Sequence, residues 1–541
     1  MSFRTGPKTS ALLALAAGGL AAIAQPPFGI VPGLLGYALL AHLVDNGPET
    51  RPLRAAFWRG WLAGFLYFLI SCWWVAEAFF VDARQIWMAP FAVCLLPAGL
   101  GLFWGAAMAV YRWLRPERPW RWLVFAGALT VAEWLRGHLL TGFPWDLPGE
   151  TWRAGSPISE AASVVGAYGL TWITLAAASA FAAPLTRAGR WARAAPPAVA
   201  VLVLAGMWLG GELRLRHAVA PSPSAPIVRI VQPDVGEESK FTEDNLRSIF
   251  FRYVSLTAAP ARRAPDIVVW SEGAIPLCTD RFLSPDEGWT AVIRQALQPG
   301  ETLMLGVCRT AGGPQNPRAY NSLIALRATA AGMEVTGVYD KYRLVPFGEY
   351  LPAQQILQPL GFKDLAHLTD GFDFGPKPRP IAPAGLPAVQ PLICYESLFP
   401  DLVRDAVNSG PRPAWIVNIS NDSWFGVTSG PLQHLNQASY RAIEEGLPIV
   451  RATPTGVSAI IDAYGNIQPG ESLGLGKSGH IDAPLPPALP TTTYGRIGEA
   501  PLVVLLLVSF MAALGPLTTL VRRLAMTSSF AWRKDEPPSG R

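Results

Sequence analysis

The segment Leu392-Ile393-Cys394-Tyr395-Glu396-Ser397 indicates how the second half of this chain is built. It closes the apolar run Val389–Cys394, which is typical of a buried strand, and a helix is predicted over 397–408. A cysteine at a strand-to-helix turn is placed for nucleophilic chemistry, because a helix N-terminus offers N–H donors and partial positive charge. We expect that charge to lower the pKa of the Cys394 thiol. The alternative is a small buried hydrophobic residue, which is the commoner role of a single cysteine.

Two further segments end predicted strands with a reactive polar group. Glu272 follows Val268-Val269-Trp270-Ser271, and Lys341 follows Tyr339-Asp340. A carboxylate can take the proton of a thiol, and an ammonium group can stabilise negative charge on a carbonyl oxygen. Taken singly, Glu272 could instead cap a helix and Lys341 could be a solvated loop residue. Spacing along the chain does not show that the three groups meet.

These segments belong to a region in which β-rich runs alternate with amphipathic stretches. It begins after the short linker Pro221-Ser222-Pro223-Ser224. The strands are richly apolar, as in sheets buried on both faces, so we predict an α/β layered catalytic domain over 225–490. The predicted strands are Ile227–Val231, Asp266–Trp270, Leu303–Val307, Asn321–Arg327, Glu334–Tyr339, Val389–Cys394, Trp415–Ile419 and Val457–Asp462, and the predicted helices are 242–257, 286–298, 397–408 and 431–446.

The first 210 residues consist instead of long apolar runs and short polar loops. Of the 541 residues, 50% are hydrophobic and only 15% are charged, which argues against a small soluble domain or a nucleic-acid-binding protein. Since a helix of about 20 apolar residues crosses a bilayer, we predict a bundle of about seven membrane helices in 1–210. An eighth is expected over 497–522, before a tail at 523–541. The predicted spans lie near 11–26, 29–44, 60–80, 89–111, 122–138, 159–184, 195–210 and 499–520.

The basic residues are unevenly distributed among the loops. Arginine and lysine gather before the first span, in every second loop and after the last span. The alternate loops hold little more than Arg84, Arg136 and Arg153. This positive-inside pattern predicts cytoplasmic termini, with 211–496 on the opposite side. A cleaved signal peptide ending at Ala22-Ile23-Ala24 is the alternative, although a second apolar run begins a few residues later.

The five cysteines are too few and too scattered for a disulfide framework or a C-x-x-C zinc site. An odd number leaves at least one free thiol. Cys278 and Cys308 both lie in the predicted exported domain and could pair, but we expect them to be free buried thiols.

Longer motifs carry a resemblance to known proteins. The Glu–Lys–Cys order at strand ends is similar to that of the nitrilase (carbon–nitrogen hydrolase) superfamily. With its membrane spans, the chain resembles the apolipoprotein N-acyltransferase family nearly end to end. The motifs are Ser71-Cys72-Trp73-Trp74, Gly142-Phe143-Pro144-Trp145, Ala167-Tyr168-Gly169-Leu170, Val231-Gln232-Pro233-Asp234, Tyr320-Asn321-Ser322, the run from Lys341 through Pro352, Cys394-Tyr395-Glu396 and Asn418-Ile419-Ser420-Asn421-Asp422-Ser423-Trp424-Phe425-Gly426.

The resemblance implies an αββα sandwich on a membrane bundle in the bacterial inner membrane, with a periplasmic catalytic domain and no metal or cofactor. It implies that Cys394 attacks an acyl ester of a membrane phospholipid and forms a thioester. The α-amine of the lipidated N-terminal cysteine of an apolipoprotein then takes the acyl chain. Glu272 matches the general base, and Lys341 matches the stabiliser of the oxyanion. Glu349, Tyr395 and Glu396 match positions that support this centre.

Several other residues are expected beside the substrate. Where many family members carry a Lys-Trp pair, this chain has Lys240-Phe241, so the indole N–H is lost and the substrate contact of Phe241 is in doubt. Asp422 and Trp424 are expected to shape the site, and His434 to be structural. The segment 342–375 is apolar for a loop and is predicted to be a lid or membrane-dipping arm, the alternative being ordinary packing. Its aromatic and leucine residues are Phe347, Tyr350, Leu351, Phe362, Leu365, Phe372 and Phe374.

Two other functions remain open on the sequence. One is a membrane-tethered amidase of the nitrilase type, in which water rather than an amine resolves the acyl-enzyme. The other is a non-catalytic membrane scaffold, against which the joint presence of Glu272, Lys341 and Cys394 argues.

Overall fold

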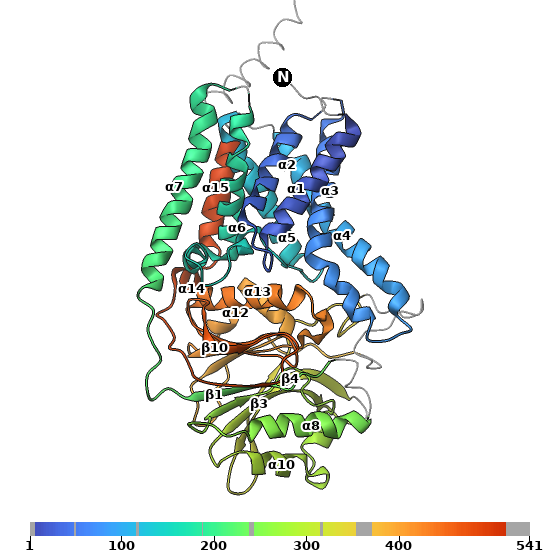
Figure 1. Cartoon of the computed structure of the whole chain (residues 1–541), viewed down its shortest axis with the longest axis vertical. Coiled ribbons are helices and arrows are strands. Elements are labelled where there is room, and N and C mark those ends of the chain that lie inside the picture. The colour runs from blue at the N-terminus through green and yellow to red at the C-terminus, as the bar shows by residue number, and fades with distance from the viewer. Residues whose placement is uncertain are drawn as a thin grey trace, which may run out of the picture.

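The computed structural model describes residues 6–47, 50–114, 118–186, 188–236, 243–313, 317–352 and 371–514. Within them, a helical bundle stands on an α/β unit (Figure 1). The bundle helices are α1 Pro7–Ala24, α2 Leu35–Asp45, α3 Pro52–Cys72, α4 Ala89–Leu114, α5 Arg121–His138, α6 Ala162–Ala180, α7 Arg190–Leu215 and α15 Ala500–Leu514. Each predicted span corresponds to one of these helices.

Five helical stretches are long and apolar enough to cross a membrane. They contain α1, α3, α4, α6 and α7, whereas α2 and α15 are apolar but shorter within the described residues. Small residues bring neighbouring helices close together. A Cβ atom on Gly18 would lie 1.9 Å from the carbonyl oxygen of Ala63, and one on Gly60 would lie 2.5 Å from that of Trp104. The contacts of α1 with α3 and of α3 with α4 are therefore of the small-residue kind common between membrane helices.

The α/β unit contains two sheets. Their strands are β1 Ile227–Gln232, β2 Ile267–Val269, β3 Thr302–Ala311, β4 Arg318–Ala328, β5 Met333–Asp340, β6 Val389–Ile393, β7 Trp415–Ile419, β8 Ile449–Ala452, β9 Ser458–Ile461, β10 Ile467–Leu473 and β11 Gly479–Pro484. One sheet has the order β11-β1-β2-β3-β4-β5, and the other has the order β10-β9-β8-β7-β6. In the first sheet β1, β2 and β3 are parallel, and in the second β6, β7 and β8 are parallel.

The two sheets face each other and are covered by helices on their outer faces. Val228 and Ile230 of β1 pack with Val417 of β7 in the core between the sheets, while Val231 belongs to the outer core of the first sheet. The helices of the α/β unit are α8 Glu243–Thr257, α9 Thr279–Phe282, α10 Trp289–Ala296, α12 Pro400–Val407, α13 Gly430–Glu445 and α14 Thr493–Ile497. The first sheet packs on α8 and α10, and the second on α12 and α13. The predicted αββα sandwich on a membrane bundle is confirmed.

Helix α13 lies between the second sheet and the bundle (Figure 1). Its side chains bind backbone groups of the bundle half: Asn436 accepts from the Ala154 N–H at 2.9 Å, and Glu444 accepts from the N–H of Ala167 in α6 at 2.7 Å. Gln433 accepts hydrogen bonds of 3.0 Å from the indole N–H groups of both Trp74 and Trp145. The α/β unit is thus joined to the bundle by directional hydrogen bonds as well as by apolar packing.

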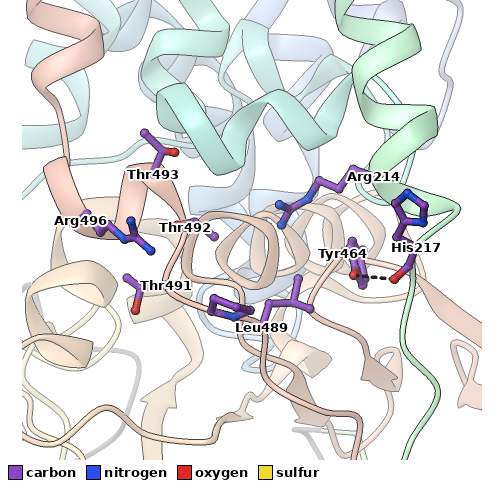
Figure 2. A pocket seen from close by; sticks show the side chains of 9 residues that line it. Arg214, His217, Tyr464, Leu489, Thr491, Thr492, Thr493 and Arg496 are labelled. Atoms are coloured by element: carbon purple, nitrogen blue, oxygen red, sulfur yellow. Dashed lines mark hydrogen bonds between the residues drawn. The ribbon is translucent and has the colours of Figure 1, made fainter.

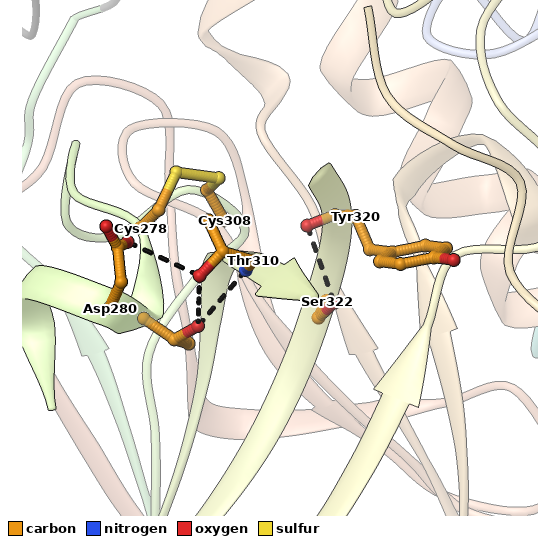
Figure 3. Close-up of a disulfide and its surroundings, with 7 residues drawn as sticks. Cys278, Asp280, Cys308, Thr310, Tyr320 and Ser322 are labelled. Carbon is orange, nitrogen blue, oxygen red and sulfur yellow. Dashed lines mark hydrogen bonds between the residues drawn. A yellow bond between two sulfur atoms is a disulfide. The ribbon is translucent and has the colours of Figure 1, made fainter. Parts of the chain in front are cut away.

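The expectation that Cys278 and Cys308 are free is wrong. They form a disulfide (Figure 3). The segment after β2 returns beside β3 and makes an isolated bridge there, which brings the two Cα atoms to 4.3 Å. The pairing therefore depends on how a loop returns to its neighbouring strand, which is not visible in the sequence.

Candidate active site

The thiol, carboxyl and ammonium groups predicted from the sequence lie together. Glu272 follows β2, Lys341 follows β5, and Cys394 follows β6 of the other sheet. The Lys341 Nζ atom lies 3.0 Å from Glu272 Oε1, and the charges of both groups act on the pKa of the buried Cys394 thiol. All three side chains are buried, with Cys394 8% exposed. Three strand ends, distant along the chain, therefore meet at one point.

A second carboxylate and an amide complete this cluster. Glu349 Oε2 lies 2.8 Å from the Lys341 ammonium, which is therefore held between two carboxylates. The Asn321 amide donates to Glu272 at 2.7 Å and to Glu349 at 2.6 Å. The other oxygen of Glu272 accepts from the backbone N–H of Asn421 at 2.8 Å. Both oxygens of Glu272 are thus bound, and the carboxylate is fixed in orientation.

The protonation states follow from burial and these contacts. Burial alone would raise the pKa of Glu272, but the Lys341 ammonium and the hydrogen bonds from Asn321 and Lys341 hold it below its ordinary value. Burial alone would lower the pKa of Lys341, but Glu272 and Glu349 raise it. Burial, and then the charge of Glu272, raise the pKa of the Cys394 thiol well above its usual range. At neutral pH the centre holds a carboxylate, an ammonium and a neutral thiol.

The expected effect of a helix N-terminus on the thiol is therefore wrong. Cys394 begins a single 3-10 turn, Cys394–Leu398, and α12 starts only at Pro400. The thiol is buried, and the turn that begins with it is too short to supply a long helix dipole. A thiol in this state could act as a nucleophile only if a base took its proton, and Glu272 is the carboxylate whose charge acts most strongly on it.

The turn that carries Cys394 is held in an uncommon conformation. Cys394 has a φ of 49°, in the left-handed region that non-glycine residues seldom adopt. The buried Glu396 carboxylate accepts from the backbone N–H groups of Ile393 and Tyr342, each at 2.8 Å, and from the Tyr339 hydroxyl at 2.9 Å. Glu396 thereby ties the Cys394 turn to the segment that carries Lys341.

Tyr395 connects this turn to the bundle. Its hydroxyl donates to the carbonyl oxygen of Gly142, in the loop after α5. Nearby, Trp74 lies 4.5 Å from Trp145 and 4.6 Å from Phe425, measured between ring centroids. The bundle motifs that contain Trp74 and Trp145 therefore meet the α/β motif that contains Phe425.

His434 and Asp422 belong to a buried network below the site. Asp422 lies 2.8 Å from the Arg451 guanidinium and 3.0 Å from His434 Nδ1, while His434 Nε2 lies 3.1 Å from the hydroxyl of Ser397. Burial alone would raise the pKa of Asp422, but Arg451 and His434 hold it well below its usual range. The network fixes the loop after β7 against the Cys394 turn, in keeping with a structural role for His434.

The residues expected beside the substrate are placed only in part. Phe347 is 51% exposed, and its N–H donates to the Tyr350 carbonyl at 2.8 Å. The Tyr350 ring lies 5.1 Å from that of Phe374, and Trp424 is half-buried in the turn Asp422–Phe425. Phe241 and residues 353–370 of the predicted lid lie outside the described residues.

Sequence reasoning assigned no role to Asn321 or Asn421, which bind Glu272 directly. The signal was their presence in two motifs of the family resemblance.

Across the described ranges, no group of three or more His, Cys, Asp or Glu side chains is arranged to hold a metal ion. A separate pocket between the end of α7 and α14 has Arg214 and Arg496 on opposite sides (Figure 2). Arg214 is already paired there with Glu160 at 2.7 Å.

Comparison with known proteins gives matches along nearly the whole chain. The family described as "Apolipoprotein N-acyltransferase N-terminal domain" matches residues 17–180, and the family described as "Carbon-nitrogen hydrolase" matches residues 228–483. Among solved structures, an amidase from Nesterenkonia sp. aligns at 16% identity, covering 53% of this chain and 98% of its own, with a TM-score of 0.34.

Curated relatives are similar over both halves. The apolipoprotein N-acyltransferase of Caulobacter vibrioides is 52% identical over 531 residues, covering 98% of either chain. That of Rhodopseudomonas palustris is 38% identical and covers 93% of this chain and 94% of its own. Since these matches run through the bundle as well as the α/β unit that bears Cys394, the chain belongs to the apolipoprotein N-acyltransferase family.

Proposed function

We propose that this acyltransferase transfers a fatty acyl chain from a membrane phospholipid to the α-amine of the N-terminal diacylglyceryl-cysteine of apolipoproteins, through a thioester on Cys394. This reaction completes lipoprotein maturation. The observation that carries the proposal is the buried Glu272–Lys341 ion pair, which acts on the Cys394 thiol, beside a membrane bundle that Tyr395 joins to the Cys394 turn. A donor that resides in the bilayer requires such a location, whereas a soluble amide does not.

In the first half-reaction, the Cys394 sulfur attacks the ester carbonyl while Glu272 takes the thiol proton. The Lys341 ammonium stabilises the oxyanion of the tetrahedral intermediate. When the intermediate collapses, the C–O bond breaks and Glu272 returns the proton to the departing oxygen. The products are the Cys394 thioester and a lysophospholipid.

In the second half-reaction, the α-amine of the acceptor attacks the thioester carbonyl, and Glu272 takes a proton from the attacking nitrogen. Lys341 again stabilises the oxyanion. Collapse breaks the C–S bond, and the proton on Glu272 passes to the Cys394 sulfur. The products are the amide and the resting enzyme with its neutral thiol.

The supporting residues have separate tasks in this scheme. Glu349 is the second carboxylate that holds the Lys341 ammonium, and it shares the Asn321 amide with Glu272. Glu396 maintains the Cys394 turn through its hydrogen bonds to Ile393 and Tyr342. Tyr395 keeps the same turn against the bundle. Phe347, Tyr350, Trp424 and Phe241 are proposed to contact the acyl chains or the acceptor.

The protein is a bacterial membrane protein, and we place its α/β domain in the periplasm with both termini in the cytoplasm. The distribution of arginine and lysine among the loops supports this topology. The Cys278–Cys308 disulfide gives independent support, because disulfides persist in oxidising compartments.

The proposal is tested with purified full-length protein and phospholipid labelled in its acyl chain. We expect a hydroxylamine-sensitive label on Cys394 that disappears when a diacylglyceryl peptide is added, with the label recovered as an amide on the peptide. Cys394→Ala should abolish the label, while Cys94→Ala, which removes an exposed thiol in the bundle, should retain it. Release of free fatty acid without transfer to the peptide would instead support the amidase alternative.

A further inference from the structure

Arg343 lies on the bundle side of the active site. Its neighbours Tyr342 and Val345 pack against the bundle core, and its own N–H donates to Glu396 at 3.2 Å. Its guanidinium carbon lies 3.9 Å from the centroid of the Phe399 ring, which packs edge-on against Tyr395. The guanidinium is therefore one aromatic ring away from the residue that follows the nucleophile.

This guanidinium lacks a full set of acceptors. Its Nη1 atom is buried and has no hydrogen-bond partner, and among the described residues its side chain forms no ion pair. Other cations of this region are compensated: Lys341 contacts two carboxylates, and Arg136 of α5 is paired with Glu133. A buried donor without an acceptor is unfavourable, and an anionic ligand that accepts from it removes that cost.

The proposed acyl donor needs such a cation. Two carboxylates, Glu272 and Glu349, face a single ammonium at the centre, so its net charge is negative when the thiol is neutral. A phospholipid brings a negatively charged phosphodiester close to its ester groups, and the centre repels it. Arginine binds phosphate through two parallel N–H donors and is the side chain best suited to fix its orientation.

We propose that Arg343 binds the phosphate of the acyl donor and thereby positions the donor's ester at Cys394. This inference rests on the proposed function. It concerns donor binding in the first half-reaction only, because the diacylglyceryl-cysteine acceptor carries no phosphate.

The test compares two donors in detergent with the full-length protein: phosphatidylglycerol, and a neutral diacylglycerol with the same acyl chains. For Arg343→Gln we expect KM for phosphatidylglycerol to rise about 10- to 100-fold while kcat changes less than about threefold, in line with the loss of a charge-assisted hydrogen bond. The kcat/KM for diacylglycerol should not change, and Arg343→Lys should restore part of the affinity. Arg281→Gln, at an exposed arginine in α9, is the matched control.

The outcomes separate this inference from the function on which it rests. If Arg343→Gln lowers kcat/KM by the same factor for both donors, Arg343 is not the phosphate ligand. The same conclusion follows if kcat/KM is unchanged for both donors. If it slows aminolysis of a preformed Cys394 thioester, its role is structural and the inference is also wrong. If the wild-type protein forms no thioester from any phospholipid, the proposed function itself fails.

Discussion

Replacing Lys341 with methionine removes the single positive charge that separates two buried carboxylates. Coulomb's law with an effective dielectric constant of about 20 gives an attraction of about 5 kcal/mol for unit charges at the 3.0 Å that separates Lys341 from Glu272. Without the ammonium, the burial of Glu272 is opposed only by its remaining hydrogen bonds, so the pKa of Glu272 rises. A larger share of Glu272 is then protonated at a given acidic pH and cannot act as a base.

Two effects on the rate follow. Protonation of the base lowers the rate of thioester formation on the acid side of the profile, and loss of the oxyanion partner lowers it by about 100- to 1,000-fold at every pH. The first loss is recovered as the pH rises through the new pKa of Glu272, whereas the second is not. In a single-turnover assay with labelled phospholipid between pH 5 and 9, the acid limb of the rate profile should move to higher pH.

The control is Lys377→Met, which removes an exposed lysine of the same domain and should leave the profile unchanged. Thermal unfolding of both variants establishes that they are folded. If the acid limb of Lys341→Met coincides with that of the wild type, the ammonium does not set the ionisation of Glu272. The electrostatic account of the site is then wrong, even if the rate is low.

Three further changes test other parts of the structure. Asn321→Leu removes hydrogen bonds to both buried carboxylates. We expect kcat/KM for thioester formation to fall about 10- to 100-fold and the free energy of unfolding to fall by about 1–3 kcal/mol. Unchanged kinetics would contradict the placement of this amide. The double variant Cys278→Ala, Cys308→Ala should lose about 3 kcal/mol of unfolding free energy, measured by denaturant titration. Its kcat should stay within about twofold of the wild-type value. A large loss of activity in the folded protein would place the disulfide in the catalytic machinery. Gln433→Leu removes the acceptor of the buried Trp145 indole N–H and one of two acceptors of the Trp74 indole N–H, and it should lower the thermal unfolding midpoint in detergent, whereas Gln298→Leu on the exposed surface should not.

Much of the fold is predictable because the length and pattern of an apolar segment indicate whether it forms a membrane helix or a buried strand. Each predicted membrane span corresponds to a helix, and the eight predicted strands lie within or beside observed ones. The strands β8, β10 and β11 are missed. The first has only four residues, and the other two contain proline and glycine, which weaken the strand signal in sequence.

The candidate site is less predictable than the fold. The residue types of Glu272, Lys341 and Cys394 indicate the chemistry, but only their places at three strand ends bring them together. The ionisation of the thiol could not be obtained from the sequence, since it depends on burial rather than on the adjacent turn. The contacts of Asn321 depend on the register of β4 against β5, where its carbonyl accepts from the N–H of Lys341.

The polar side chains of α13 have a consequence for how the molecule is assembled. Gln433, Asn436 and Glu444 are buried and accept hydrogen bonds from residues of the bundle half, so we expect that neither half reaches its final state alone. The boundary drawn on the sequence near residue 211 marks a change of composition, and we expect that it does not separate two independent units of stability. We expect the bundle and the α/β unit to unfold in one cooperative transition. We also expect the active site to keep a fixed distance from the membrane surface, so that both substrates must move to the active site.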